Sequence, residues 1–433
     1  MFKWNILGVL RDRTRSVFPL TVVAVGVALT VVLIGFMDGI IGGMIQSTAN
    51  LDTGSLRMVN KAYYEEEHLF PMDRALAGQT ESGKWLKSHS PEEVTWSARI
   101  RWGALLDIPD KEGMTLSQTP IIGTALDLLS SGSEEIHRLQ LTESLVQGRL
   151  PVSPKEMLVG YQLAETLNLK LGQRATLLGQ TFDGALAADN YIIVGFVKFG
   201  LTALDKKMAL IDLKDAQDSF YMEDIVTDWL GWVPPGFDIE KLELIKNELT
   251  DSASDWIKTP PASWSPDDRP IFLTVLDQRG LGAIYKKFKA VRAVIIGVFI
   301  FLMILVLWNA GILNGIHRYG ELGLRLAMGE SHAQISFSLV TEAFAIGIIG
   351  AVIGAIVGAG CTLYLQVKGL DMGNNLAQTG LMLNDVVRAR LSWRGVWGGM
   401  IPGILSGVLG SWVASLAIYK RSTSNLFREL ENE

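Results

Sequence analysis

The chain contains a single cysteine, Cys361, so no disulfide within the chain can hold its fold together. Histidine is also scarce, and the five histidines lack the spacing of a metal site. The GxxxxGK[ST], GxSxG and HExxH motifs are missing, which excludes ATP hydrolysis by a phosphate loop and gives no support to hydrolase chemistry. A net charge of −6, without a basic patch that contains aromatics, argues against a nucleic-acid partner. We therefore expect no catalytic site, metal or cofactor on this chain.

Charge is missing from long stretches of the sequence, and this absence predicts the fold class. Four uncharged, mostly apolar stretches occupy residues 17–37, 293–316, 343–366 and 395–419. Each is long enough to cross about 30 Å of hydrocarbon as a helix. With 48% hydrophobic residues, the chain is also too apolar for an ordinary soluble protein of its length. The sequence predicts a membrane protein with four transmembrane α-helices.

Basic residues orient these spans. The first apolar stretch exceeds the roughly 7–15 residues of a signal-peptide core, so we interpret it as an uncleaved anchor. Cations that place both chain ends in the cytoplasm are Lys3, Arg11, Arg13 and Arg15 at the N-terminus and Lys420, Arg421 and Arg428 at the C-terminus. A further group falls on the outer side and consists of Lys286, Lys287, Lys289 and Arg292. We expect this outer group to meet anionic lipid headgroups.

About 250 residues separate the first two spans, which is enough for one or two folded domains. Stretches rich in β-branched and aromatic residues predict strands at 54–64, 96–108 and 191–199. Residues 154–178 predict a strand, a short helix, a turn at Gly172 and another strand. Asp238 is expected to cap a helix whose apolar stripe is Ile239, Leu242, Ile245 and Leu249. The sequence predicts an α+β extracytoplasmic domain between the first two transmembrane helices.

Between the second and third spans lies a short amphipathic segment. Glu321 precedes Arg325 by four residues, the favourable order for a helical ion pair, and Leu322 and Leu326 form an apolar stripe beside it. Gly329 is expected to end this helix in a left-handed turn. Ser331 and Gln334 have the spacing of a capping box, which would begin the third span. From the pattern alone, this segment is either a contact for a soluble partner or an interfacial loop helix.

The third span carries a stripe of small residues. Gly350, Gly354 and Gly358 recur every four residues, and this spacing favours a close helix–helix contact in the membrane. Glu342 lies near the cytoplasmic end of the same helix, where an unpaired carboxylate is costly. We expect it to pair with a cation such as Arg318 or Arg325.

These features carry a family resemblance. Residues 321–331 read ELGLRLAMGES and are followed by Glu342-Ala343 and the glycines of the third span. This order resembles the EIGxxxAxGAxxxxI…EA signature of the FtsX/MacB-type permeases, the mechanotransmitting class of ABC transporter membrane subunits. Residues 419–430 are similar to the terminal element of the family but lack its usual proline and alanine. The resemblance extends over essentially the whole chain.

The outer region is most similar to the LolC/LolE lipoprotein-releasing branch. Short motifs carry this similarity, at residues 53–58, 148–150, 160–172, 194–196 and 205–217. The resemblance implies a Porter-like part and a Sabre-like part, the latter inserted at about residues 110–221. In LolC a proline-containing hairpin recruits the periplasmic lipoprotein carrier. Residues 178–190 correspond to it but are shorter and lack proline, so this chain is either a LolE-like partner of a hook-bearing chain or part of a related system.

The predicted boundaries follow from the spans and the resemblance. They are 1–16, cytoplasmic segment; 17–45, transmembrane helix 1; 46–285, periplasmic domain; 286–316, transmembrane helix 2; 317–333, cytoplasmic coupling helix; 334–366, transmembrane helix 3; 367–392, periplasmic loop; 393–419, transmembrane helix 4; and 420–433, cytoplasmic tail.

The resemblance also implies functional residues and partners. It implies a cytoplasmic ABC ATPase dimer, which would bind the ATP and Mg²⁺. The residues implied to contact this dimer are Glu321, Leu322, Arg325, Leu326, Met328, Gly329 and Ser331. A second permease copy or a paralogue is implied, because four spans cannot form a dimeric entrance. Apolar candidates for a lateral lipid or cargo entrance between the first two spans are Ile40, Met44, Val294 and Val298.

Three functions remain open for such a chain in a bacterial inner membrane. The favoured one is a non-catalytic permease subunit that extracts lipoproteins from the outer leaflet of the inner membrane, with a periplasmic carrier or adaptor as a candidate partner. The second is a MacB-like efflux permease that works with a periplasmic adaptor and a separate ATPase. The third is an FtsX-like transmembrane regulator of a cell-wall hydrolase.

Overall fold

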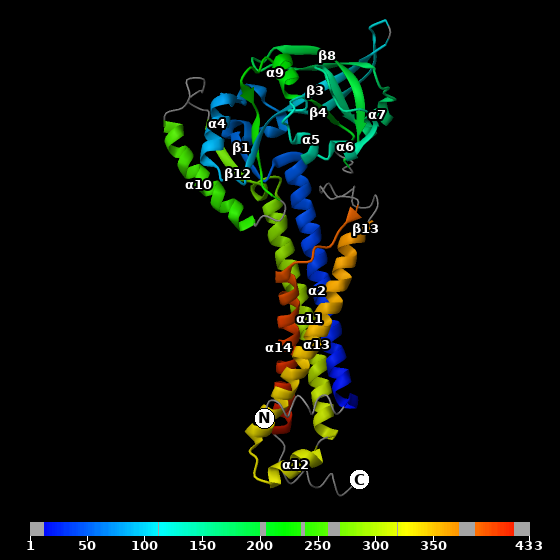
Figure 1. The fold of residues 1–433 in the computed structure, drawn as a ribbon, viewed down its shortest axis with the longest axis vertical. Helices are drawn as coiled ribbons and strands as arrows, with labels where there is room; N and C mark the ends of the chain where they lie inside the picture. The colour runs from blue at the N-terminus through cyan, green and yellow to red at the C-terminus, as the bar shows by residue number, and fades with distance from the viewer. Residues whose placement is uncertain are drawn as a thin grey trace. The chain divides into compact units, whose positions relative to one another are not determined.

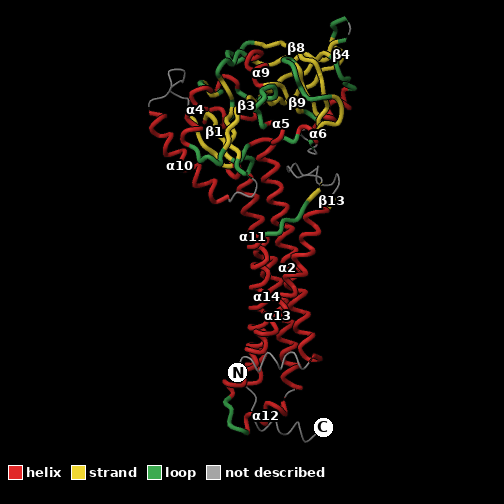
Figure 2. The backbone as a smooth tube through the Cα atoms, in the orientation of Figure 1, coloured by secondary structure: helices red, strands yellow, loops and turns green. Residues whose placement is uncertain are grey.

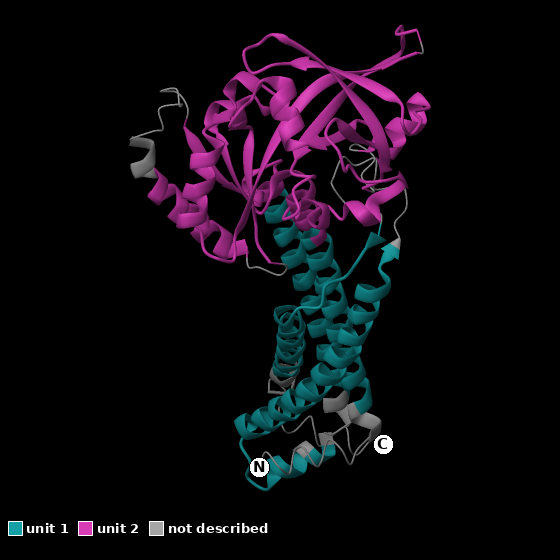
Figure 3. Ribbon diagram, turned by 45° about the horizontal axis from the view of Figure 1, so that its top comes forward, with its two compact units in different colours: residues 1–42, 284–371, 386–433 teal, residues 43–283, 372–385 magenta. Residues whose placement is uncertain are grey.

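The computed structural model describes residues 13–110, 112–199, 205–234, 239–258, 269–317, 319–371 and 386–419. The chain forms two compact units, shown in different colours in Figure 3. Unit 1 comprises residues 1–42, 284–371 and 386–433, and unit 2 comprises residues 43–283 and 372–385. Most of the terminal cations used for orientation, and the C-terminal family element beyond Tyr419, lie outside the described part of the chain.

Unit 1 is a helical bundle. Its long helices run side by side in Figure 1 and are α2 (Arg13–Thr48), α11 (Leu281–His317), α13 (His332–Lys368) and α14 (Trp393–Tyr419). Each is long and apolar enough to cross a membrane, so the four predicted spans are confirmed. The short helix α12 (Tyr319–Ala327) lies at one end of the bundle. At the other end, β13 (Leu370–Asp371) pairs with β14 (Val386–Val387).

Six strands of unit 2 close into a barrel, drawn in yellow in Figure 2. They are β3 (Thr95–Pro109), β4 (Thr115–Leu126), β6 (Glu156–Gly160), β7 (Arg174–Gln180), β8 (Leu186–Val197) and β9 (Met208–Asp212). The hydrogen-bonded order β3-β4-β9-β6-β8-β7 returns to β3, with parallel pairing only at β4–β9 and β6–β8. Leu126, Leu158, Leu210 and Val197 contribute to its apolar core.

The first part of β3 continues into an open sheet. Its order is β12 (Pro270–Thr274), β1 (Leu56–Asn60), β11 (Asp228–Trp232) and β3, all antiparallel. Two longer helices accompany it, α4 (Gln79–His89) and α10 (Ile239–Lys258). Because β3 belongs to both the open sheet and the barrel, the two parts of unit 2 share one continuous strand.

Short elements complete unit 2. The helices are α3 (Lys61–Glu65), α5 (Glu135–Arg138), α6 (Leu141–Ser144), α7 (Tyr161–Leu167) and α9 (Leu213–Phe220). The strands are β2 (Leu76–Ala77), β5 (Leu145–Gly148) and β10 (Ile225–Val226). A π-helical turn, Ala49–Thr53, follows α2, and 3₁₀ turns occupy Glu67–Leu69, Met72–Arg74 and Val275–Asp277.

Most predicted elements of the outer domain are confirmed. Residues 154–178 fold as β6, α7, a turn with Gly172 at φ +78°, and β7. The strand predicted at 54–64 is wrong in its second half, because Asn60 accepts a hydrogen bond from the Ala62 amide and caps α3. The stripe Leu242, Ile245 and Leu249 of α10 is buried as expected, whereas its predicted cap Asp238 lies outside the described residues.

Candidate functional site

The segment between α11 and α13 is a capped helical connection. Arg325 Nη2 donates to Glu321 Oε1 at 2.8 Å, which is the predicted pair along α12. Gly329 has φ +97°, a left-handed conformation that ends the helix. Ser331 Oγ accepts from the Gln334 amide at 3.3 Å, and the Ser331 amide donates to Gln334 Oε1 at 2.8 Å. The capping box therefore starts α13 at His332, four residues after Met328.

Apolar side chains on this connection are exposed. Met328 is 70% exposed, Leu324 on α12 is 63% exposed, and Phe337 on the first turns of α13 is 71% exposed. Leu326 is half-buried, and the side chain of Leu322 lies outside the described residues. Exposed apolar residues grouped on a short charged helix require cover from a partner or from lipid. Leu324 and Phe337 were not predicted as contact residues, although Leu324 is an apolar residue four positions before Met328.

The small residues of α13 pack directly against α2. A Cβ atom at Gly354 would lie 2.3 Å from the Ala24 carbonyl oxygen, and one at Gly358 would lie 2.8 Å from the Ala28 carbonyl oxygen. At Gly350 the nearest atom would be Val23 Cβ at 3.0 Å. These distances leave no room for a side chain, so the glycine stripe sets the distance between the two helices.

Glu342 lies half-buried in α13, two turns before this stripe. Arg325 contacts Glu321, and Arg318 lies outside the described residues, so the cation that pairs with Glu342 stays a prediction.

The outer ends of α2 and α11 are joined by an ion pair. Asp38 of α2 pairs with Arg292 of α11, and the two side chains are 25% and 33% exposed. A small cavity of about 50 Å³ adjoins the pair and is lined by Met37, Ile41, Tyr285, Phe288 and Lys289. Arg292 therefore has a carboxylate partner on the neighbouring helix that the sequence analysis did not include, and its contact with lipid headgroups stays a prediction. The signal in the sequence was Asp38, the acidic residue within the otherwise uncharged run of α2.

The predicted entrance residues differ in exposure. Val294 is 66% exposed and Val298 is 51% exposed, and both lie on the apolar surface of α11. Ile40 is half-buried. Met44 is only 2% exposed, so its side chain contributes almost nothing to the accessible surface. The accessible surface of this predicted set therefore belongs mainly to α11.

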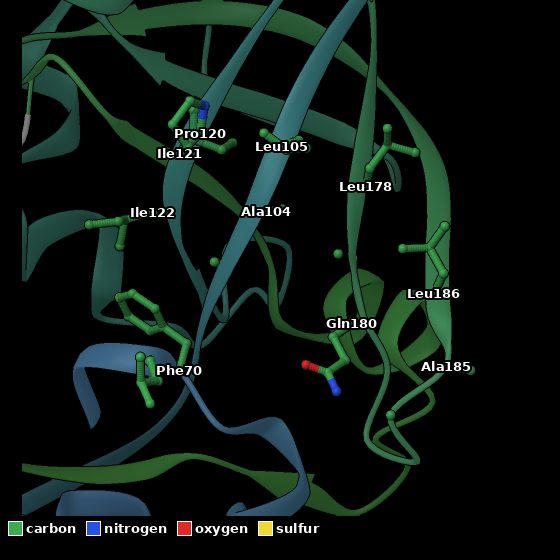
Figure 4. Close-up of a pocket in the computed structure, with 14 residues that line it drawn as sticks. Phe70, Ala104, Leu105, Pro120, Ile121, Ile122, Leu178, Gln180, Ala185 and Leu186 are labelled. Atoms are coloured by element: carbon green, nitrogen blue, oxygen red, sulfur yellow. The ribbon is translucent and has the colours of Figure 1, made fainter. Parts of the chain in front are cut away.

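The barrel of unit 2 carries an apolar groove on its outer face (Figure 4). The groove has a volume of about 650 Å³, and its walls include Leu69, Phe70, Leu105, Ile122, Leu178 and Leu186. A Cβ atom at Gly103 would lie 3.2 Å from Phe70 Cδ2, so the aromatic ring rests on a strand that has no side chain beneath it. An exposed apolar groove of this kind can bind apolar parts of another molecule.

The hairpin formed by β7 and β8 borders this groove. Residues 181–185 form its turn, where the Thr181 amide donates to the Ala185 carbonyl at 2.8 Å and Gly184 has φ +81°. Leu186 follows the turn and is 83% exposed.

Two protein-family models match parts of this chain. A model described as FtsX-like permease C-terminal matches residues 293–423. A model described as MacB-like periplasmic core domain matches residues 17–244, which is more than half of the chain. This chain belongs to the FtsX/MacB-type ABC transporter permeases. Membership implies an ABC ATPase partner, and the four apolar helices make this permease a multi-pass membrane protein.

Among solved structures, the permease is similar to the crystal structure of the periplasmic region of MacB from Actinobacillus actinomycetemcomitans. The two are 8% identical, the match covers 56% of this chain and 95% of that chain, and the TM-score is 0.34. A search of curated proteins gave no match.

Proposed function

We propose that this permease extracts lipoproteins from the outer leaflet of the inner membrane, with ATP hydrolysed by a separate ATPase dimer. The observation that carries the proposal is the exposed surface of α11. In an apolar 18-residue stretch of α11, only 11% is buried inside the chain. In the corresponding stretches of the other three spans, 33–44% is buried. A span with so little internal cover leaves a wide apolar surface for lipid, for acyl chains or for a second permease.

The pair formed by Asp38 and Arg292 supports a lateral route along this surface. It joins α2 and α11 near their outer ends, on the same helix as Val294 and Val298. Ionisable side chains within spans are rare and often mark substrate pathways, so the pair is a candidate contact for a polar head group. Acyl chains of a lipoprotein would then lie against Val298 while its head group passes the ion pair.

ATP hydrolysis would drive movement along this lateral route from the cytoplasmic end of the bundle. In the proposal, Glu321, Arg325 and Leu326 of α12, with Leu324 and Met328, contact the ATPase, which holds the ATP and Mg²⁺. The capping box at Ser331 makes α12 and α13 a stiff connection, so that a displacement of α12 is passed into the bundle. The permease itself would bind no cofactor and catalyse no reaction.

A second permease chain would complete the entrance. Residues 178–190 lack the proline of the LolC hook, so in this proposal the paralogous chain recruits the periplasmic carrier. The apolar surface of α11 is available to face that second chain and the cargo together.

The test is purification of the permease from native membranes in mild detergent, followed by identification of everything that co-purifies. We expect an ATPase, a second permease and triacylated lipoproteins that are released on addition of ATP. Met328→Ser should reduce release per ATP hydrolysed. The matched control is Val367→Ser at the opposite end of α13, because Val367 is 78% exposed and Met328 is 70% exposed.

Photocrosslinking locates the route on α11. A photoreactive amino acid at Val298, which is 51% exposed, should capture lipoprotein. The same amino acid at Leu313, which is 53% exposed and closer to the cytoplasmic end, should capture lipid only. Equal capture of lipoprotein at both positions would contradict an entrance at the outer end.

The match to the MacB-like periplasmic core domain favours efflux as the second candidate. Co-purification of a periplasmic adaptor without lipoprotein would establish that function instead. A co-purifying cell-wall hydrolase would indicate an FtsX-like regulator.

A further inference from the structure

Six charged residues of unit 2 form a closed ring of ion pairs in which arginines and carboxylates alternate. We call this set the charge ring, and its members in order are Asp52, Arg101, Asp228, Arg57, Glu67 and Arg279. Three positive and three negative charges cancel, and every member contacts two neighbours of opposite sign.

One half of the charge ring is almost completely buried. Arg101 Nη1 lies 2.6 Å from Asp52 Oδ1, and Arg101 Nε lies 3.1 Å from Asp228 Oδ2. Asp228 also pairs with Arg57. Arg57 and Asp228 are 0% exposed, and Arg101 is 6% exposed. Thr227 supports this half, since its hydroxyl donates to Asp228 Oδ2 at 2.9 Å.

The other half reaches the surface. Arg57 Nη1 lies 2.8 Å from Glu67 Oε2, and Glu67 Oε1 lies 3.2 Å from Arg279 Nη1. Arg279 Nε closes the ring at 2.8 Å from Asp52 Oδ2. Gln278 joins from the neighbouring position, where its Oε1 accepts from Arg57 Nη1 at 3.0 Å. The side chain of Arg279 is 45% exposed, so this is the half that a substitution can open without disturbing the core.

Two members of the ring adjoin the first two spans in the chain. Asp52 belongs to the π-helical turn Ala49–Thr53 that directly continues α2, and Arg279 precedes α11 by one residue, Gly280. The other members come from β1, β3, β11 and the 3₁₀ turn Glu67–Leu69. The ring thus joins the residues where the chain enters unit 2 to those where it leaves.

Electrostatics favour the charged forms of Asp228 and Arg101. Burial acts to raise the pKa of Asp228, but attraction by Arg101 and Arg57 lowers it below the ordinary aspartate value. Burial acts to lower the pKa of Arg101, and its carboxylate neighbours raise it instead. Removing one member therefore leaves a buried charge without its partner, which is far more costly than removing a pair together.

We propose that the charge ring is a positioning element that holds the end of α2 and the start of α11 at a fixed separation, so that a displacement of either span moves the domain as one body. The transmission part of this inference rests on the proposed function, whereas the fixed separation does not. Arg101 and Asp228 place the ring on the sheet, and Arg279 ties α11 to Asp52.

A second buried ion pair shows what a purely structural pair looks like in the same unit. Arg99 Nη2 lies 2.7 Å from Glu135 Oε2, with both side chains at most 2% exposed. It joins β3 to α5 and contains no residue next to a span. Glu135→Gln is therefore the matched control for substitutions in the charge ring.

The first measurement is a distance between the two span ends. Spin labels would be placed at the exposed positions Gln46 of α2 and Ala283 of α11, in the full-length protein in nanodiscs with Cys361 replaced by serine. We expect a narrow pulsed-EPR distance distribution in the parent, loss of that narrow distribution in Arg279→Gln, and its recovery in Arg279→Lys. An unchanged distribution in Arg279→Gln, or equal broadening in Glu135→Gln, would overturn the inference.

The second measurement uses the complex with its native ATPase. Arg279→Gln should retain ATP hydrolysis and lose ATP-driven release of lipoprotein, while Glu135→Gln should retain both. Normal release by Arg279→Gln, despite broadened distances, would refute the transmission role. If the parent itself releases no lipoprotein, the proposed function fails, and the EPR comparison still decides whether the ring fixes the separation.

Discussion

The helical bundle and the outer domain of this permease bring their elements together in different ways. In the bundle, α13 meets α2 where Gly354 leaves room for a backbone carbonyl that a Cβ would approach to 2.3 Å. In the outer domain, strands distant in the sequence converge on the charge ring, whose buried half includes Arg57 and Asp228. The first kind of contact depends on glycine, which has no Cβ to keep the two helices apart. The second depends on opposite charges that meet only in the folded chain.

The difference arises because lipid surrounds the helical bundle and water surrounds the outer domain. Lipid offers no hydrophobic drive between helices, so spans associate by close packing of small residues. The outer domain buries apolar side chains out of water, and this gain can support the desolvation of a charged network. Substitutions in the two regions should therefore fail for different reasons, and this can be measured.

The largest effect is expected from opening the buried half of the charge ring. Arg101→Met leaves Asp228 and Asp52 without one of their cations, and breaking a buried pair in this way typically costs about 3–5 kcal/mol. Thermal unfolding of the full chain in detergent, followed by tryptophan fluorescence, should show a large decrease in Tm.

The control for this prediction is Arg174→Met. Arg174 is an exposed arginine on β7 of the same unit, and surface substitutions usually stay within about 0.5 kcal/mol. Similar Tm values for the two variants would show that the ring contributes little to the stability of the domain.

The bundle should be most sensitive at its closest helix contact. Gly354→Ala places a methyl group against the Ala24 carbonyl oxygen and should cost roughly 1–3 kcal/mol through overpacking. The matched control is Gly360→Ala on the same helix, where an added Cβ has no heavy atom within 4 Å. Alanine is the better helix former, so Gly360→Ala should be neutral or slightly stabilising. If both variants unfold at the same temperature, the glycine stripe does not set the distance between α13 and α2.

The same contrast explains how far the sequence could predict the fold. Gly350, Gly354 and Gly358 are visible as a periodic pattern within one helix, and the capping box at Ser331 is visible as a local motif. Local signals of this kind suffice for the four spans, for α12 and for β1, β3, β6, β7 and β8 of the outer domain, whereas β4, β9, β11 and β12 were not predicted. The notable failure, at Lys61–Glu65, arose because a single cap at Asn60 overrides a β-branched and aromatic composition.

The charged contacts could not be predicted in the same way. Asp52 and Arg279 are 227 positions apart in the sequence, and Asp38 and Arg292 are 254 positions apart. A hydrophobic period predicts which face of an element is buried, but it does not indicate which charges on different elements will meet. The sequence accordingly did not indicate that Arg292 pairs with a carboxylate on a neighbouring helix.

Neutralising the ion pair of the bundle should have an intermediate to small effect. Asp38→Asn removes the partner of Arg292, but both side chains are partly exposed, so we expect a loss of about 1 kcal/mol or less. The loss should appear as a modest decrease in Tm that shrinks at high salt concentration. Lys289→Gln, which changes an exposed cation beside the same cavity, is the control and should leave Tm unchanged. An equal decrease in both variants would mean that general charge, and not this pair, stabilises the contact.

The smallest effect is expected at the rim of the barrel, where Glu156 contacts the loop that follows β5. A hydrogen bond from Arg149, with further ones from the Val152 and Ser153 amides, lowers the pKa of Glu156 from 4.5 to about 2. Because the folded pKa lies below the unfolded one, this contribution is complete above about pH 4.5 and is lost as the pH falls toward 2. Glu156→Gln should therefore lower Tm slightly at neutral pH and flatten its decline between these pH values. Arg149→Gln should flatten the decline only in part, since the two amides remain. Parallel Tm curves for the parent and Glu156→Gln would show that this carboxylate gains nothing from its partners, unlike those of the charge ring.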